Sequence, residues 1–366
     1  MHIQFGPDGT TEEFGRLAQS IAQRPEVEGL LIMACDGNAL QADEVDPILH
    51  QASVPVIGGV FPELIYNGQK YQKGTIVAGL SAMGEILVVP KLDKPETDFS
   101  DLIETHFPEV EEGHTMLVFV DGLSSQIGSF INSLFFVLGL EVNYLGGGAG
   151  SLDFEKRDPC LFSNQGMLSN HALLSLLPIQ SGVGVKHGYK SISGPYQVTE
   201  SEGNVIKTLD WEPAFEVYKR VIEHTSGLRF GADNFFDIAK GFPFGIKKMG
   251  EEVVVRDPIV AQEDGSLVCV GWVPDDAFVD ILEGKVASLV QAAQQAMLDG
   301  IEALDNEEGP RTHIFIDCIS RVLFMEEEFR TRCPLGVVIY ICASCALQLS
   351  QGSYWSNAEK LVKSSS

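Results

Sequence analysis

The charged residues best placed for chemistry follow apolar segments that are typical of buried strands. Asp121 and Asp317 each end such a segment, and Arg321 follows Asp317 closely. Arg256 and Asp257 end another. A ligand with both an ammonium and a carboxylate group, such as an amino acid, needs Asp for the first and Arg for the second. These residues therefore predict a polar ligand site; the alternative is that each Asp caps a following helix, which is worth about 1 kcal/mol.

A glycine cluster, Gly146–Ser151, is a second candidate for ligand contact. It does not match a phosphate loop, because no Lys-Ser/Thr pair follows a four-residue spacer, and the dinucleotide pattern needs Gly where Ser151 stands. Two alternatives remain open. The cluster is either a tight turn that lets a ligand approach the main chain at Gly147 and Gly148, or a place where a sheet packs closely. The glycine pair Gly58-Gly59 in an earlier, similar segment favours packing.

Other motifs give weaker signals. His187 lies in a glycine-rich segment that leads into strand-like residues instead of a helix, so we reject a phosphate loop. Two roles stay open for its imidazole, a hydrogen bond to a ligand or one to a backbone carbonyl. Cys342-Ala343-Ser344-Cys345 is a lone Cys-x-x-Cys motif, and a zinc site needs two further ligands. No nucleophile elbow or His-Glu-x-x-His motif is present. The sequence therefore predicts no metal, no cofactor and no catalytic residues, and we expect that the protein is not an enzyme.

Composition narrows the possible partners and the location. The 366 residues include 51 acidic and 25 basic side chains, a formal charge of −26, which repels nucleic acid. No apolar run approaches the length of about 18 residues that a membrane helix needs, so we expect no membrane insertion. The N-terminus lacks the pattern of a secretion signal, and seven scattered cysteines are typical of a reducing compartment. These features predict a cytoplasmic protein.

An internal repeat in the sequence predicts the strands and helices that position these residues. Asp36-Gly37 and Asp121-Gly122 each end an apolar run, 85 positions apart, and glycines Gly58 and Gly146 follow, 88 positions apart. Each copy predicts a buried strand, a helix, a second strand that ends in glycines, and a hairpin. One sheet face of each copy is covered by its helix, and the other copy is the natural cover for the second face. The predicted fold class is therefore α/β (α+β), with two sheets packed face to face and helices outside (αββα).

The sequence also predicts how the chain divides into domains. An N-terminal domain spans residues 28–221 and holds the repeat, with copies at 28–90 and 113–180. A smaller α/β C-terminal domain spans 222–345, and residues 346–366 form an atypical tail that we expect to be disordered. Within the second domain, residues 312–321 again form an apolar strand that leads an Asp into a helix, which is consistent with a third, diverged copy.

Several segments in series resemble the FIST family, from about residue 28 to about residue 335. They are Phe119-Val120-Asp121-Gly122, Leu145–Gly150, His187-Gly188, Val198–Ile206, Pro213-Ala214-Phe215, Phe242–Gly245, Val255–Pro258 and Asp317–Arg321. The resemblance implies N- and C-terminal FIST domains in an intracellular sensory module of signal transduction. Such modules occur alone or joined to histidine kinase, chemotaxis-receptor or cyclic-dinucleotide output domains in prokaryotes, and to F-box domains in eukaryotes. Small ligands, amino acids among them, are their proposed signals.

The sequence and the resemblance together predict a module that binds a small polar ligand and signals through a partner protein, since no output domain is visible. The alternative is an interaction scaffold without a metabolite ligand. The predicted ligand-binding residues are Asp121, Gly122, Gly147, Gly148, His187, Arg256, Asp257, Asp317 and Arg321. After Gly336 the sequence departs from the usual ending of the family. This departure predicts a change of reading frame or a divergent terminus, which would expose a sheet edge.

Overall fold

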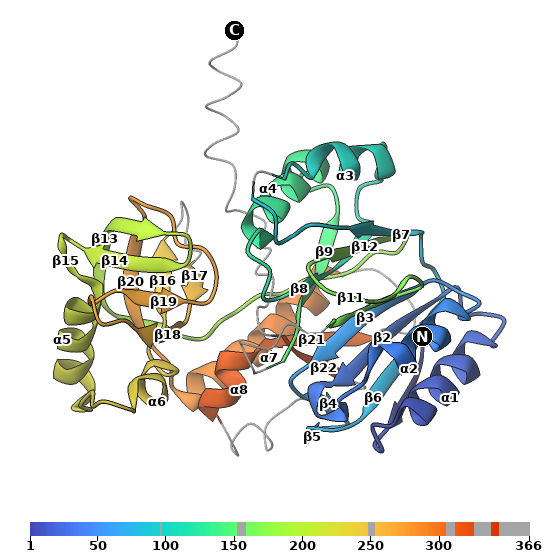
Figure 1. The fold of residues 1–366 in the computed structure, drawn as a ribbon, viewed down its shortest axis with the longest axis horizontal. Helices are drawn as coiled ribbons and strands as arrows, with labels where there is room; N and C mark the ends of the chain where they lie inside the picture. Colours follow the sequence, from blue (N-terminus) through green and yellow to red (C-terminus); the bar gives the residue numbers. More distant parts are fainter. Residues whose placement is uncertain (96, 152–158, 248–252, 305–311, 326–337, 344–366) are drawn as a thin grey trace, which may run out of the picture. The chain divides into compact units, whose positions relative to one another are not determined.

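The computed structural model describes the chain except residues 96, 152–158, 248–252, 305–311, 326–337 and 344–366 (Figure 1). It forms two compact units. Unit 1 contains Met1–Gly184, Leu298–Val322 and the described part of Phe329–Leu349, whereas unit 2 contains Val185–Met297 and the described part of Leu323–Glu328. The chain therefore returns to unit 1 within helix α7 (Val286–Ala303). The sequence-based boundary between residues 221 and 222 stays a prediction, and the expected disordered tail, 346–366, lies outside the described residues.

Unit 1 contains the predicted duplication. The first copy and its flanking elements are β1 (His2–Gly6), α1 (Thr11–Ala22), β2 (Gly29–Cys35), the short 3-10 helix η1 (Asp36–Asn38), α2 (Ala42–His50), β3 (Val56–Phe61), β4 (Leu64–Tyr66), β5 (Gln69–Tyr71) and β6 (Thr75–Leu80). The second set is β7 (Ile86–Val89), α3 (Ser100–His106), β8 (Thr115–Asp121), α4 (Ile127–Leu138), β9 (Asn143–Ala149), β10 (Leu161–Ser163), β11 (Gly166–Leu168) and β12 (Ala172–Leu177). In both copies the first two strands are parallel, and a hairpin and an antiparallel strand follow.

The two copies build the predicted αββα sandwich. One sheet has the order β1-β6-β2-β3-β10-β11 and the other β7-β12-β8-β9. Side chains of β8 alternate between two cores, as the period of two along a strand requires. Leu117 and Phe119 pack against the first sheet, and Phe61 of β3 meets Phe119 edge to edge with ring centroids 6.1 Å apart. Met116 and Val118 face the opposite way.

Helices cover the two outer faces of the sandwich (Figure 1). Helix α1 begins after Thr10, whose side chain accepts a hydrogen bond from the Glu13 backbone N–H, and it buries Phe14, Leu17 and Ile21 at helical spacing. Helices α3 and α4 cover the second sheet, against which they bury Ile103, Phe130 and Leu134. The predicted fold class is therefore confirmed.

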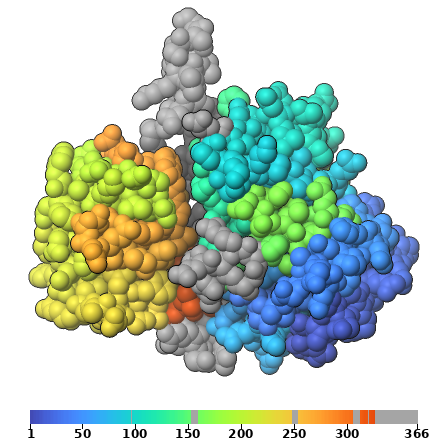
Figure 2. All heavy atoms as spheres, in the orientation of Figure 1, coloured from blue at the N-terminus to red at the C-terminus, as the bar shows by residue number. Residues whose placement is uncertain are grey.

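A third strand-helix-strand copy completes unit 1. Strand β21 (His313–Cys318) leads into α8 (Ile319–Met325), and β22 (Val338–Ala343) lies parallel to β21, as β3 lies parallel to β2. The hairpins are exchanged between copies. Hairpin β10–β11 of the second copy pairs with β3 of the first, and hairpin β4–β5 of the first pairs with β22 of the third. On the face shown in Figure 2, green atoms, which include hairpin β10–β11, lie between the blue first copy and the teal α3–α4 region.

Unit 2 is smaller and is built on one sheet with the order β17-β16-β20-β13-β14-β19-β18. Its elements are β13 (Lys190–Glu202), β14 (Val205–Leu209), β15 (Glu212–Pro213), α5 (Ala214–Ser226), α6 (Phe235–Ala239), β16 (Phe244–Lys247), β17 (Val253–Arg256), β18 (Pro258–Ala261), β19 (Leu267–Cys269) and β20 (Phe278–Glu283). Asp257 separates β17 from β18, and these two strands form opposite edges of the sheet. The sheet must therefore curl until its edges approach each other at Asp257.

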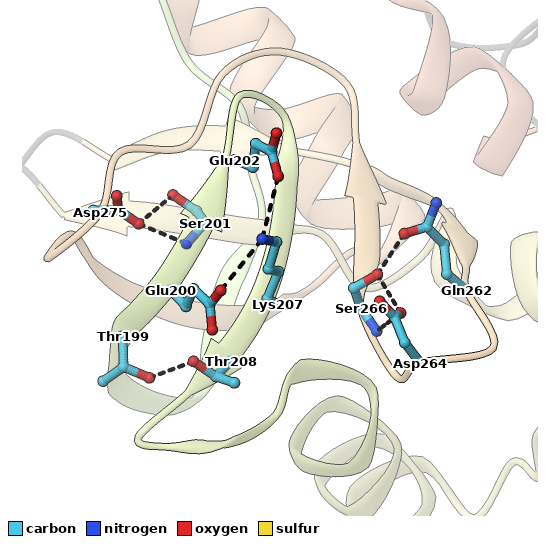
Figure 3. A network of polar contacts seen from close by, with 10 residues as sticks. All are labelled: Thr199, Glu200, Ser201, Glu202, Lys207, Thr208, Gln262, Asp264, Ser266 and Asp275. Carbon is cyan, nitrogen blue, oxygen red and sulfur yellow. Dashed lines mark hydrogen bonds and ion pairs between the residues drawn. The ribbon is translucent and has the colours of Figure 1, made fainter.

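Several polar side chains on and beside the β13–β14 hairpin of unit 2 bind one another (Figure 3). Lys207 lies within 3.2 Å of both Glu200 and Glu202, and Thr199 and Thr208 share a hydrogen bond across β13 and β14. The two carboxylates raise the pKa of Lys207 above its usual value. This network pins the register of the hairpin on its solvent side.

Candidate functional site

The structure places a pocket in unit 1 where the first two copies meet. Its polar lining includes Asp36, Asp121 and Ser151, and its apolar lining includes Leu40 and Val60. Asp36 follows β2, Asp121 ends β8, and Ser151 lies just past β9. The pocket therefore lies outside the carboxyl ends of two parallel strand pairs. Ligands of α/β proteins commonly bind at such strand ends.

Backbone hydrogen bonds tie the two copies together beside this pocket. The Gly150 N–H donates to the Val60 carbonyl at 2.8 Å, and the Val60 N–H donates to the Cys160 carbonyl at 2.7 Å. Within the second copy, the Gly122 N–H donates to the Ala149 carbonyl at 2.8 Å. The exchanged hairpin β10–β11 adds Cys160 and Met167 to the lining. The pocket walls are thus fixed by main-chain contacts from both copies.

The glycines of β3 and β9 are required by close strand packing. Gly58 has a φ of 147°, and a Cβ atom there would lie 1.8 Å from the Ile32 carbonyl oxygen. A Cβ at Gly146 would lie 1.7 Å from the Val118 carbonyl oxygen. Any larger residue would collide with the backbone of the neighbouring parallel strand. For these two positions the geometry supports packing over ligand contact.

The predicted residues Gly147 and Gly148 lie within β9, opposite Phe119 and Val120 of β8. Among the described residues that line the pocket, the glycine cluster contributes Gly150 and Ser151. The part of the cluster that lines the pocket is therefore its end, beyond the strand.

Asp121 is the predicted site residue that the structure brings into the pocket. Its side chain is buried, and its two carboxylate oxygens accept hydrogen bonds from the backbone N–H groups of Leu123 at 3.2 Å and Asn170 at 2.7 Å. Helix α4 begins only after Gln126, so Asp121 does not cap it. The carboxylate instead holds the turn after β8 against the start of β12.

Cys160 lies beside Asp121 and was not predicted as a site residue. Burial raises the pKa of its thiol well above the usual value, and the charge of Asp121, which also bonds the thiol, raises it further. Cys160 therefore stays a protonated thiol near neutral pH. Asp36 was also missed, although it was available from the sequence, because the repeat aligns Asp36-Gly37 with Asp121-Gly122.

Asp317 and Arg321 come together at the end of β21 in the third copy. The Arg321 Nε atom lies 3.0 Å from the Asp317 Oδ1 atom, and both side chains are about 5% exposed. The Cys318 backbone N–H also donates to Asp317, at 2.8 Å. Burial raises the pKa of Asp317, and the guanidinium of Arg321 opposes that rise. The pair is a buried ion pair.

The remaining predicted residues, His187, Arg256 and Asp257, belong to unit 2. The His187 Nδ1 atom accepts a hydrogen bond from the Tyr189 backbone N–H at 3.0 Å. The Arg256 guanidinium donates to the backbone carbonyls of Trp272 and Val255, each at 2.9 Å. Asp257 is buried. The pocket of unit 1 includes none of the three among its described lining residues.

Among the described residues, no group of three His, Cys, Asp or Glu side chains is arranged to hold a metal ion. Within the same part of the chain, every helix is too short or too polar to cross a membrane.

Comparison with known proteins agrees with the architecture. The model of the FIST N domain matches residues 17–212, and the model of the FIST C domain matches residues 214–349. No curated protein and no solved structure matches the chain significantly. The second match contains β21 and β22, so the third copy of unit 1 belongs to the FIST C sequence. Because the two matches cover most of its length, the chain belongs to the FIST family.

Proposed function

We propose that this protein is a cytoplasmic sensory module of signal transduction that binds a small polar ligand in the pocket of unit 1 and signals through a partner protein. The observation that supports the proposal is the pocket itself. Its lining combines Asp36 and Asp121 with apolar residues at parallel strand ends. Membership in the FIST family supports the sensory role.

The lining of the pocket favours a ligand with an amino group. Among its described residues it has two carboxylates and no Lys or Arg. An ammonium group between Asp36 and Asp121 would gain charge-assisted hydrogen bonds. The apolar side chains of Leu40, Val60 and Met167 would contact the uncharged part of the ligand. Amino acids and small amines are therefore the first candidates.

The experiment is a thermal-shift screen of the purified protein against amino acids and small amines. A true ligand at a hundredfold excess over its dissociation constant stabilises the folded state by about 2.7 kcal/mol. Asp36→Asn should abolish the shift, because it removes one of the two carboxylates from the lining. Asp43→Asn is the matched control, since it makes the same change at an exposed position of α2 in the same unit.

The result that contradicts the proposal is equally plain. If no compound shifts the melting temperature, or if the shift persists in Asp36→Asn, the ligand does not bind in this pocket. The proposal also gives the protein no catalytic role. Turnover of a small substrate that is lost in Asp36→Asn but kept in Asp43→Asn would show that it is an enzyme.

A specific observation favours an interaction scaffold as the second candidate. Trp211, in the turn between β14 and β15, is 78% exposed and has a φ of 65°. A bulky residue in this left-handed region costs about 1–2 kcal/mol, and tryptophan is a frequent anchor of protein interfaces. Trp211→Gly relieves the strain and removes the aromatic surface. If the scaffold is correct, this variant is at least as stable as the wild type but no longer retains the partner.

A further inference from the structure

Two of the three sheets of unit 1 follow one pattern, in which the second strand of a copy carries the hairpin of another copy on its outer edge. In the first sheet, β2 and β3 are followed by hairpin β10–β11 of the second copy. In the third sheet, β21 and β22 are followed by hairpin β4–β5 of the first copy. The strands β3, β9 and β22 also contact one another pairwise. The three copies are therefore arranged as a closed cycle.

The second sheet breaks this pattern. Its order ends with β8 and β9, and no strand among the described residues pairs with the outer edge of β9. The second copy gives its hairpin to the first, and the first gives its hairpin to the third. Among the described residues, the outer edge of β9 is therefore the position of this pattern that no hairpin fills.

The sequence after β22 resembles the two hairpins that the structure describes. Leu64–Tyr71 has the sequence LIYNGQKY, Leu161–Leu168 has LFSNQGML, and residues 347–354 have LQLSQGSY. The turns of the first two are Asn-Gly and Asn-Gln, and Ser-Gln occupies that place in the third. Gly352 aligns with Gly166, whose φ of 101° suits glycine. The FIST C match runs to residue 349 and so enters this segment.

The connection between β22 and residues 347–354 has nearly the same length as the connection between β3 and hairpin β4–β5. Strand β3 ends at Phe61, and its hairpin begins at Leu64. Strand β22 ends at Ala343, and the similar segment begins at Leu347. The connection to the similar segment is therefore about as short as the one that links β3 to its hairpin.

We propose that the outer edge of β9 is a strand-docking site and that residues 347–354 of the same chain occupy it as a third exchanged hairpin. An open edge presents unpaired backbone N–H and C=O groups, which favours pairing with another strand. Filling the edge completes the cycle with the same backbone pairing that β10 makes on β3. This proposal replaces the expectation of a disordered tail for these residues.

The register of β10 on β3 identifies the residue that tests the proposal. The Cys160 carbonyl accepts from the Val60 N–H, and Phe162, two residues further along β10, is paired with Gly58. Because bonding alternates along an antiparallel pair, the Phe162 N–H points toward β3. Gln348 aligns with Phe162, so its N–H is the one that would point toward β9. Gln348→Pro removes that N–H, and Lys360→Pro is the matched control beyond the hairpin.

The experiment is hydrogen exchange of the full chain, read by mass spectrometry for peptides that cover β9 and β3. We expect β9 to exchange slowly in the wild type and about tenfold or more faster in Gln348→Pro, since a lost strand pair lowers the local opening free energy. Exchange in β3 should stay unchanged in both variants, and exchange in β9 should stay unchanged in Lys360→Pro. Equal β9 exchange in the wild type and Gln348→Pro would overturn the proposal.

A second measurement covers the case in which Gln348→Pro fails to fold. A chain that ends at Ala346 is mixed with a synthetic peptide of residues 344–366. The proposal expects slow exchange of β9 to return when the peptide is added. No change on addition of the peptide overturns it, as does protection of β9 that rises with protein concentration without the peptide, which would show that a second copy occupies the edge.

Discussion

Two buried aspartates, Asp121 and Asp317, end the corresponding strands β8 and β21 but are stabilised in different ways. Asp121 accepts backbone N–H bonds from Leu123 and Asn170 and faces a pocket. Asp317 lies against the guanidinium of Arg321, and both are buried. The same place in a repeated unit thus carries a carboxylate held by the main chain in one copy and an ion pair in the other. The aspartate of the second copy thus lines a candidate binding site, whereas the aspartate of the third copy makes a structural contact.

The largest expected effect comes from breaking the ion pair. Arg321→Met leaves the Asp317 carboxylate buried without its cation, which typically costs about 3–5 kcal/mol of unfolding free energy. Urea denaturation measures this loss. The double variant Asp317→Leu/Arg321→Met should recover much of it, because an apolar pair often replaces a buried ion pair without net loss. If the double variant is no more stable than Arg321→Met, the loss of unfolding free energy does not come from leaving Asp317 without its cation.

Removing the other aspartate should cost less. Asp121→Ala leaves the N–H groups of Leu123 and Asn170 without their acceptor, and an unpaired buried donor costs about 1–3 kcal/mol. Asp121→Asn retains one acceptor oxygen and should lose less. Denaturation curves of both variants, taken beside Arg321→Met, test the order. If Asp121→Ala is the more destabilising of the two single changes, the contrast drawn between the two aspartates is wrong.

The pH dependence of stability should distinguish the two sites further. Burial raises the pKa of Asp317 above its ordinary value of 3.8, so the folded state binds this proton more tightly than the unfolded state. The stability that Asp317 contributes is therefore fully present below pH 3.8 and is lost as the pH rises through its folded pKa. The unfolding free energy of the wild type minus that of Asp317→Asn should fall over this range. A difference that is flat or rises with pH would contradict the assigned direction.

The smallest effect is expected for an exposed ion pair between an arginine and a carboxylate. Arg220 makes two hydrogen bonds to Glu212, at 2.8 and 3.2 Å, but both side chains are more than half exposed. Water and salt screen such pairs strongly. Arg220→Met should change the melting temperature little, and high salt should remove the remaining difference. A loss as large as that of Arg321→Met would show that exposure is not what separates the two pairs.

Much of unit 1 could be predicted from the sequence, because short motifs recur in each copy of the repeat. Asp36-Gly37 and Asp121-Gly122, with Gly58 and Gly146 after them, repeat in order and spacing. Apolar runs and helical periodicity then gave the αββα arrangement, which the structure confirms. Residues 338–343, after the departure at Gly336, form β22 parallel to β21. The hypothesis of a change of reading frame or a divergent terminus after Gly336 stays a prediction.

The candidate site was only partly predictable. Asp121 was found because it ends an apolar run, whereas Cys160 reaches the pocket on a hairpin that pairs with the other copy. Nothing local in the sequence signals that exchange. His187, Arg256 and Asp257 were grouped with Asp121 by residue type, and the structure places them in unit 2. Charge type alone does not say which strand ends meet.

By itself, the sequence determined the repeated unit, the strands and helices of each copy and the FIST family, because these depend on short-range periodicity and on residue order. Only the tertiary structure decided that the hairpins are exchanged, that β17 and β18 lie at opposite edges of one sheet, and that Asp317 is paired with Arg321. Backbone hydrogen bonding is the same for any strand sequence. The choice of partner strand therefore depends on which faces and edges the whole fold leaves available.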